Sequence, residues 1–359
     1  MAVDRGKLLV KSPYYITEAG SAGFTSEIEI RIWNGLFTSE PTSPNYLLTK
    51  QVISDTATQA VFEISKIIES SFDHLSNVYT NLPSANTDSL WVNVKSFNGS
   101  VNRDDTFIGL DGYSYFNEGL NVNPTDTTLI SERILYHYTD IPLRLPVYCS
   151  GATNANSVEF RLGTNVVSTT SLTAYTSSLN SYDKVKYITK SGSVSGAIDN
   201  ILVKNSSGTV LDTISVVPMN CSRYDPYVVS FINKFGVNQE LVFNLVSKES
   251  IEVDKKSFNR QILDLTGTPT YNTTRHQTKE YNSSVKETIT LNSNYIDESL
   301  NDTIGQLISS EAVWVTSNGV TYPVNVSTKN LDYKKSVNEG LINYTIKFDY
   351  AFNKRNNVY

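Results

Sequence analysis

Three aspartates form the densest group of potential metal ligands in the sequence. Asp104, Asp105 and Asp111 lie in the stretch RDDTFIGLDG. Carboxylate oxygens bind Ca²⁺, but a calcium loop needs its oxygen ligands in a fixed alternation along the chain. The spacing of these aspartates does not supply that alternation. We therefore expect a polar loop here rather than a metal site.

Histidines and cysteines are few and widely separated. His74, His137 and His276 show no spacing typical of metal ligands, so we expect surface or structural roles for them. Cys149 and Cys221 are the only cysteines. Two buried thiols are the favoured interpretation, and a single disulfide between them stays open, because two cysteines are too few for a disulfide framework.

The sequence motifs of common catalytic sites are missing. There is no GxSxG nucleophile turn, no GxxxxGK[ST] phosphate loop and no GxGxxG turn after a strand. The sequence therefore predicts a protein that is not an enzyme and that uses no cofactor. The carboxylate pair of a glycosidase cannot be recognised in the sequence of a β-rich chain. A carbohydrate-active enzyme accordingly remains the least favoured alternative.

Three aromatic residues gather within the stretch DGYSYFNEG. Tyr113, Tyr115 and Phe116 could stack on a sugar or bind a partner at the tip of a loop, since tyrosine is enriched at protein interfaces. Packing within the core and edge of a β domain is the favoured interpretation. Under the other interpretation, the middle of the chain would be a receptor-binding or glycan-binding module.

The overall charge and hydropathy exclude several classes of partner. A formal net charge of -6 and a pI near 5.2 argue against general nucleic-acid binding, which requires a basic surface. No segment approaches the roughly 18 consecutive apolar residues of a membrane-spanning helix. The first residues contain no long apolar run, so we expect no signal peptide and synthesis in a reducing cytosol.

The composition predicts a mainly β protein. The chain has 359 residues, with 22 Tyr and 14 Phe against 2 Met, and aromatic residues suit the half-buried surface of a sheet. Turn signals and changes of pattern divide it into three expected domains, at residues 1–85, 86–216 and 217–359. The first should be a small β domain with one short helix, whose apolar stripe is Ile64, Ile67, Ile68 and Phe72. The second should be a β-sandwich or small barrel of short strands.

The third domain combines strands with the clearest helix of the chain. Residues 295–309 should form it, with Asn294 as the N-cap and an apolar stripe that includes Leu300, Ile304 and Leu307. Asn318 and Gly319 between apolar strands indicate a hairpin. Residues 253–284 are polar and interrupted by Gly-Thr-Pro, and we interpret them as a long excursion from the domain.

A strand with one apolar face lies almost at the end of the chain. Ile342, Tyr344, Ile346 and Phe348 alternate with polar residues, the period of a strand buried on one face. Chain ends are usually poorly ordered unless they are packed. We therefore expect this strand to be a full member of the third domain's sheet, with its apolar face on the stripe of Leu300, Ile304 and Leu307.

Three stretches resemble blocks in structural proteins of tailed bacteriophages, particularly those that infect Bacteroidota. They are KSPYYI and EIEIRIWNG within residues 11–35, SRYDPYVVSFINKFGVNQELVF at 222–243, and LDYKKSVNEGLINYTIKFDYAFNKRNNVY at 331–359. The blocks cover the beginning and the end of the chain, and the middle carries no such resemblance. The resemblance indicates the family more specifically than it indicates which component of the virion the chain is.

The resemblance implies a tail or baseplate protein with a tail-tube-like third domain, in which packed sheets and one amphipathic helix form each subunit. In that family, neighbouring sheets associate into a ring around the tail channel. The two β segments that precede this domain depart from a plain tail tube, and favour a hub, distal tail or adaptor protein. The implied partners are further copies of this chain, with six subunits as the first expectation, and other tail proteins of the virion. The family pattern offers no catalytic residues.

Overall fold

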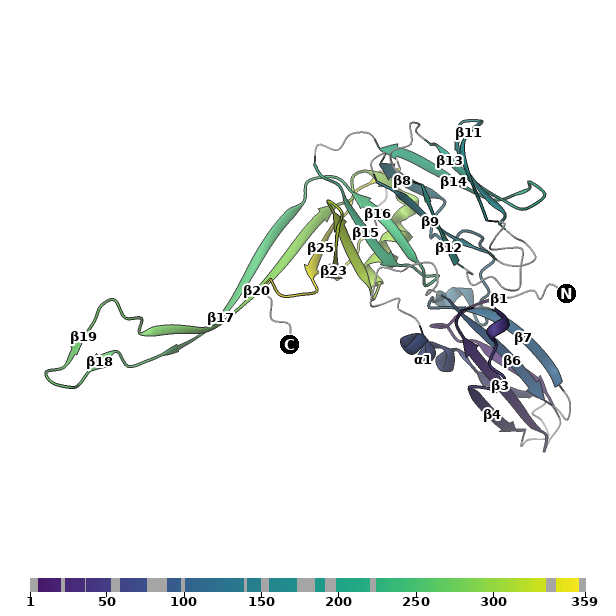
Figure 1. Ribbon diagram of the computed structural model, residues 1–359, viewed down its shortest axis with the longest axis horizontal. Helices are drawn as coiled ribbons and strands as arrows, with labels where there is room; N and C mark the ends of the chain where they lie inside the picture. Colours follow the sequence, from purple (N-terminus) through teal and green to yellow (C-terminus); the bar gives the residue numbers. More distant parts are fainter. Residues whose placement is uncertain are drawn as a thin grey trace.

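The computed structural model describes residues 6–20, 23–35, 37–52, 59–75, 89–97, 101–138, 141–149, 155–172, 185–190, 198–219, 224–333 and 340–354. This part of the chain is mainly β, with several sheets, none of which closes into a barrel (Figure 1). The expected mainly β, sandwich-like fold class is confirmed. A long two-stranded arm projects from the body of the molecule.

The N-terminal sheet has five strands in the order β1-β7-β6-β3-β4. β1 pairs with β7 in parallel, and the other pairs are antiparallel. The strands span Gly6–Leu9 (β1), Thr25–Trp33 (β3), Tyr46–Gln51 (β4), Ser89–Phe97 (β6) and Val101–Leu110 (β7). Since β6 and β7 belong to it, this sheet continues past the expected domain boundary at residue 85.

A helix and a strand pair cover one face of the N-terminal sheet. Helix α1 (Ser65–Leu75) directly follows β5 (Gln59–Glu63), which pairs antiparallel with β2 (Tyr15–Ala19). Ile64, Ile68 and Phe72 are buried in the same core as Ile28 and Ile30 of β3, and Ile67 packs against it. The expected helical stripe is therefore confirmed.

The middle of the chain forms a two-layer arrangement. One layer is a sheet in the order β11-β10-β13-β14-β8, and the other is the pair β12-β9. The strands span Ile134–Tyr138 (β8), Leu143–Tyr148 (β9), Ser157–Leu162 (β10), Asn165–Ser171 (β11), Val185–Lys190 (β12), Asn200–Lys204 (β13) and Val210–Met219 (β14). Leu145 and Ile188 of the pair share a core with Val158, Phe160 and Ile201 of the sheet. This packing of apolar faces is that of a small sandwich.

The C-terminal sheet has seven antiparallel strands in the order β16-β15-β22-β23-β25-β20-β17. They span Tyr227–Ile232 (β15), Asn238–Phe243 (β16), Lys248–Asn259 (β17), Thr278–Asn292 (β20), Val313–Ser317 (β22), Val320–Val326 (β23) and Thr345–Tyr350 (β25). Asn318 and Gly319 both have positive φ, as the expected Asn-Gly hairpin turn between β22 and β23 requires.

The helical segment of the C-terminal domain begins later than the sequence predicts. Residues Ile296–Asp297 form the short strand β21, a 3₁₀ turn covers Glu298–Leu300, and helix α3 spans Asn301–Ser309. Asn294 has a φ of 63°, whereas an N-cap residue adopts extended backbone angles. Asp297 meets that requirement, and its carboxylate accepts a hydrogen bond from the Ser299 amide at 2.9 Å. The expected start at residue 295 and the expected N-cap are therefore wrong.

The closing strand is an internal member of the C-terminal sheet. β25 lies between β23 and β20, so both of its edges are paired within the chain. Ile342, which lies in the short strand β24 (Leu341–Ile342), Tyr344, Ile346 and Phe348 are all buried in one core with Leu300, Ile304 and Leu307. The expected packing of this strand on the helical stripe is confirmed. The strand itself is interrupted at Asn343 and Tyr344, between β24 and β25.

Candidate assembly interface

Two strands of the C-terminal sheet continue outward as a long hairpin, which we call the arm (residues 252–286; Figure 1). β17 and β20 pair from Lys248 with Thr290 to Asn259 with Thr278, with a bulge between Lys256 and Ser257. All 12 residues of β17 are exposed. The interpretation of residues 253–284 as an excursion holds, but the segment is a regular ribbon rather than a loop.

Apolar side chains lie along the arm without a core to cover them. Val253 is 47% exposed, Phe258 46% and Tyr281 64%. The rings of Phe258 and Tyr281 lie 6.0 Å apart across the ribbon. An isolated two-stranded hairpin is at best marginally stable in water, because it buries little apolar surface. The arm therefore exposes apolar surface that no other described part of the chain covers.

The outer end of the arm, which we call the tip (residues 259–279), has a defined local structure. The short strands β18 (Leu263–Asp264) and β19 (Thr270–Tyr271) pair there. Asp264 accepts hydrogen bonds from the amide and hydroxyl of Thr266, at 3.0 and 2.6 Å. Asn272 accepts equivalent bonds from Thr274, at 2.9 and 2.7 Å. These local bonds hold the tip in one shape while its apolar side chains face solvent.

The inner end of the arm borders a groove on the face of the sheet that carries the core. On this face, Ile289 pairs with Phe348 in the core, and the next positions outward are Glu287 and Tyr350. The groove has a volume of about 610 Å³. We call it the root groove, and its main lining residues are Glu249, Ile251, Glu287, Tyr322, Tyr350, Phe352 and Lys354.

Aromatic rings form one wall of the root groove. Tyr322, Tyr350 and Phe352 lie with ring centroids 5.4 to 5.8 Å apart. Tyr322 is 39% and Phe352 41% exposed. Aromatic rings combine a large apolar area with few rotatable bonds, and this makes them frequent anchors at interfaces.

Two carboxylates give the root groove an acidic character. Glu287 accepts a hydrogen bond from Lys354, and the Tyr227 hydroxyl donates to Glu249 at 3.5 Å. Burial raises the pKa of Tyr350 to about 12, with the nearby charge of Glu249 as the next cause and that of Glu287 as a smaller one. The groove therefore offers aromatic surface and negative charge at the same place.

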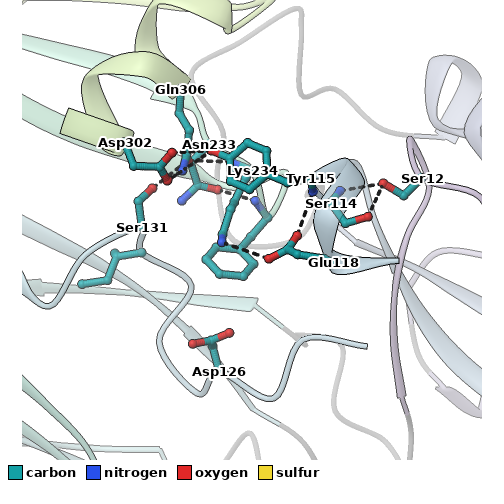
Figure 2. A network of polar contacts seen from close by, with 12 residues as sticks. Ser12, Ser114, Tyr115, Glu118, Asp126, Ser131, Asn233, Lys234, Asp302 and Gln306 are labelled. Atoms are coloured by element: carbon teal, nitrogen blue, oxygen red, sulfur yellow. Dashed lines mark hydrogen bonds and ion pairs between the residues drawn. The ribbon is translucent and has the colours of Figure 1, made fainter. Parts of the chain in front are cut away.

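The aromatic cluster singled out in the sequence lies elsewhere, and its Tyr115 lies beside Asp302 and Gln306 of helix α3 (Figure 2). The Tyr115 hydroxyl donates to Asp302 Oδ1 at 2.6 Å, and Tyr113 packs against the ring of Tyr115 with centroids 5.8 Å apart. Phe116 begins a 3₁₀ turn (Phe116–Glu118) and is fully exposed. The structure thus separates the three residues: the two tyrosines contribute to a contact between domains, and Phe116 points into solvent.

Polar side chains from three parts of the chain meet around Tyr115, in the network drawn in Figure 2. Gln306 donates to Asp302 Oδ2 at 2.7 Å, and its carbonyl accepts from Ser131 at 2.7 Å and from the Lys234 amide at 3.0 Å. Burial, followed by the hydrogen bond to Asp302, raises the pKa of Tyr115 above its ordinary value. The hydroxyl is thereby kept protonated, in the state in which it can donate to the carboxylate.

The backbone itself is closely packed at this place, which we call the junction (residues 111–115 and 233–236). The Tyr113 amide donates to the Lys234 carbonyl at 2.8 Å. A Cβ added at Gly112 would lie 2.4 Å from the Lys234 carbonyl oxygen, and one at Gly236 would lie 2.3 Å from the Asp111 carbonyl carbon. Only glycine permits backbones to approach this closely.

An apolar core continues beneath the junction. Its buried residues come from the N-terminal sheet, the middle of the chain and the β15–β16 turn: Leu9, Trp33, Trp91, Ile108, Leu110, Leu129, Tyr148, Val185, Phe235 and Val237. All three segments of the chain are therefore joined through one shared core.

The aspartates considered as metal ligands do not lie in a loop. Asp104 and Asp105 are part of β7, where Asp105 pairs with Arg103 at 2.8 Å. Asp111 lies beyond the end of the strand and pairs with Lys11 at 3.3 Å. The expected polar loop is therefore wrong for the first two. Within the described ranges, no group of three or more His, Cys, Asp or Glu could hold a metal ion.

The histidines and cysteines have separate environments. Burial, followed by the charge of Lys190, lowers the pKa of His137 in β8. His276 is exposed on the tip. His74 belongs to α1, and its side chain lies outside the described structure, as does Cys221. Cys149 is buried. No helix among the residues that the structure describes is long and apolar enough to cross a membrane.

No protein-family model and no curated protein matches this chain.

Proposed function

We propose that this chain is a structural protein of a tailed-bacteriophage virion, forming an oligomeric ring in the tail or baseplate in a hub, distal tail or adaptor role. The arm joins each copy to the next. The observation that carries the proposal is the exposure of the arm, in which a regular ribbon with apolar side chains leaves the domain that anchors it.

The physical argument is one of incomplete packing. Burying a large apolar side chain stabilises a protein by roughly 1.5–3 kcal/mol, and the arm and its tip expose several of them. A second copy is a suitable partner, because each copy then supplies one arm and receives another. Such a head-to-tail contact is heterologous and generates a ring when the rotation between copies closes. The resemblance of the end blocks to bacteriophage structural proteins supports the same assignment.

The position of the aromatic cluster favours this function over glycan binding. A sugar-stacking platform needs exposed ring faces, but both tyrosines are half-buried: the Lys234 ammonium lies 5.4 Å from the centroid of the Tyr115 ring, and Tyr113 packs edge-on against Tyr115. Both line a cleft between the N-terminal and C-terminal sheets, together with Lys11, Asp111 and Glu311.

Sedimentation velocity of the full chain and of an arm-deleted variant tests the proposal. In the variant, Asn-Gly replaces residues 252–286 and joins Ile251 to Glu287, which are direct partners in the ribbon. We expect the full chain to form a closed oligomer and the variant to be a folded monomer. As a control, Leu162→Ser with Val166→Ser alters a hairpin whose exposure is similar, 45% and 49%, and should leave the oligomer intact. A full chain that stays monomeric at high concentration would contradict the proposal.

The virion part of the proposal has its own test. Mass spectrometry of purified particles should detect this chain in a fixed ratio to the other tail proteins. Its absence from intact particles would remove the assignment to the tail, even if the chain formed a ring in solution.

A further inference from the structure

We propose that the tip of one copy binds in the root groove of the next copy. This inference rests on the proposed function, since it specifies where the arm of an assembled ring docks. It commits to a second copy of this chain as the occupant of the groove.

The length of the arm excludes the groove's own tip as its occupant. β17 has 12 residues, and at about 3.3 Å per residue it spans roughly 40 Å. The ribbon runs outward from the sheet, so the tip lies far from the root of the same arm (Figure 1). A tip can therefore reach a root groove only in another molecule.

The groove is the uncovered end of a face that is otherwise packed. Helix α3 covers the part of this face that includes Ile289, Ile346 and Phe348. Further out on the same face, Ile251 is 55% exposed, beside Tyr322 and Phe352. An apolar surface continuous with a core is a place where a partner's side chains can extend that core.

The tip and the groove have opposite charges. Residues 259–279 carry Arg260, Arg275 and Lys279 against one carboxylate, Asp264. The groove carries Glu249 and Glu287 against one ammonium group, that of Lys354. Complementary charges of this kind fix the register of an interface and accelerate association.

The apolar groups of the two surfaces also correspond. Leu263 is 43%, Leu265 62% and Tyr271 63% exposed on the tip. The rings of Tyr322, Tyr350 and Phe352 offer the groove wall against which such side chains can pack. The local bonds of Asp264 and Asn272 hold the tip in shape before it binds, and this reduces the entropy lost on association.

A complementation experiment tests the inference with two variants that each lack one surface. The groove variant is Tyr322→Ser with Phe352→Ser, and the tip-less variant is the arm deletion described above. Each alone should fail to form the oligomer, with self-association weakened by about tenfold or more in the groove variant. Mixed together, they should form a one-to-one complex, because the groove variant still supplies a tip and the tip-less variant still supplies a groove.

A matched control separates loss of the groove from loss of an aromatic ring. Tyr46 on β4 is 39% exposed, as Tyr322 is, and Tyr46→Ser should leave the oligomer unchanged. Circular dichroism and the melting temperature establish that the groove variant is folded. A folded groove variant that assembles like the wild type would overturn the inference while leaving the ring proposal standing. The absence of a mixed complex would overturn it too, whereas a wild-type chain that never assembles would instead contradict the proposed function.

Discussion

The junction and the arm are two places where the chain extends beyond a single sheet, and they differ in how far their packing is completed. At the junction, Gly112 and Gly236 bring two backbones into direct contact above a shared core. In the arm, every residue of β17 is exposed, including Phe258. The first region satisfies its own apolar and polar groups. The second leaves its apolar groups exposed to solvent, and it is the region to which we assign binding to another copy in the proposed assembly.

Removing the end of the chain should reduce the stability of the C-terminal domain more than any other change considered for these two regions. A chain that ends before Leu341 lacks β24 and β25, so that β20 and β23 lose their shared neighbour and the core loses Ile346 and Phe348. We expect the C-terminal domain not to fold, with loss of its near-UV circular dichroism and of its cooperative melting. The arm deletion is the matched comparison, because it removes a longer segment and should retain both signals. A truncated chain that kept its melting temperature would show that the closing strands are not needed for folding, and would contradict the expected difference from the arm deletion.

A methyl group at Gly236 should have the next largest effect. Gly236→Ala places a Cβ 2.3 Å from the Asp111 carbonyl carbon at a residue with a φ of 75°, and we expect a loss of roughly 3 kcal/mol or more of unfolding free energy. Gly208 has a φ of 80° but no atom within 4 Å of such a Cβ. Gly208→Ala should cost only about 1–2 kcal/mol, the penalty of the left-handed conformation itself. Urea unfolding of both variants measures the difference, and equal losses would mean that the junction is not closely packed.

The hydroxyl of Tyr115 should contribute a smaller, pH-dependent stability. Tyr115→Phe removes the hydrogen bond to Asp302, and we expect a loss of about 1 kcal/mol at neutral pH. The folded-state pKa of Tyr115 is raised above the unfolded value of about 10, so the folded protein keeps a proton that the unfolded chain releases. This contribution is present below about pH 10 and decreases as the pH rises above it.

Denaturant titrations above neutral pH measure this effect. The wild type should lose stability with increasing pH, and Tyr115→Phe should reduce that slope. Tyr350→Phe in the root groove should reduce it as well, because burial raises the pKa of Tyr350 to about 12 and the unfolded chain again releases its proton first. An unchanged slope in Tyr115→Phe would show that this hydroxyl does not couple the junction to pH.

Substitutions in the arm should have the smallest effect on folding. Phe258→Ser, measured in the groove variant to keep the chain monomeric, should change the unfolding free energy by less than about 0.5 kcal/mol, as for other exposed sites. In an otherwise wild-type chain, the same change should weaken assembly, as measured by sedimentation across a concentration series. A large loss of stability in the monomer would mean that the arm packs within its own chain.

The sequence predicts those elements that have one buried and one exposed face. The alternation of Ile342 to Phe348 and the stripe of Leu300, Ile304 and Leu307 each carry the period of their element, and both lie in the core as expected. The helical segment starts later than predicted because Asn294 and Asp297 are both good capping residues, and only the backbone angles show that Asp297 caps the 3₁₀ turn that leads into α3.

The arm and the root groove carry no such period. Both faces of β17 are exposed to solvent, so its residues lack the regular alternation that identifies a strand. From the sequence, residues 253–284 could therefore be predicted only as a polar excursion. The groove combines Glu249, Tyr322 and Phe352 from separate strands, and the order of those strands decides that they meet. The close approach of Gly112 and Gly236 is equally a property of the folded chain. Asp111-Gly112 and Phe235-Gly236 each indicate a turn, but nothing in either turn specifies the other.

The rigid connection at the junction fixes the orientation of the N-terminal sheet relative to the strands that lead into the arm. In a ring joined tip to groove, every copy then holds its N-terminal sheet at the same radius and the same tilt. The N-terminal sheets would then share the symmetry of the ring, although they need not touch one another. The exposed Phe116, on the turn beside the junction, would recur around the ring at regular angular intervals, as a set of equivalent apolar contact points.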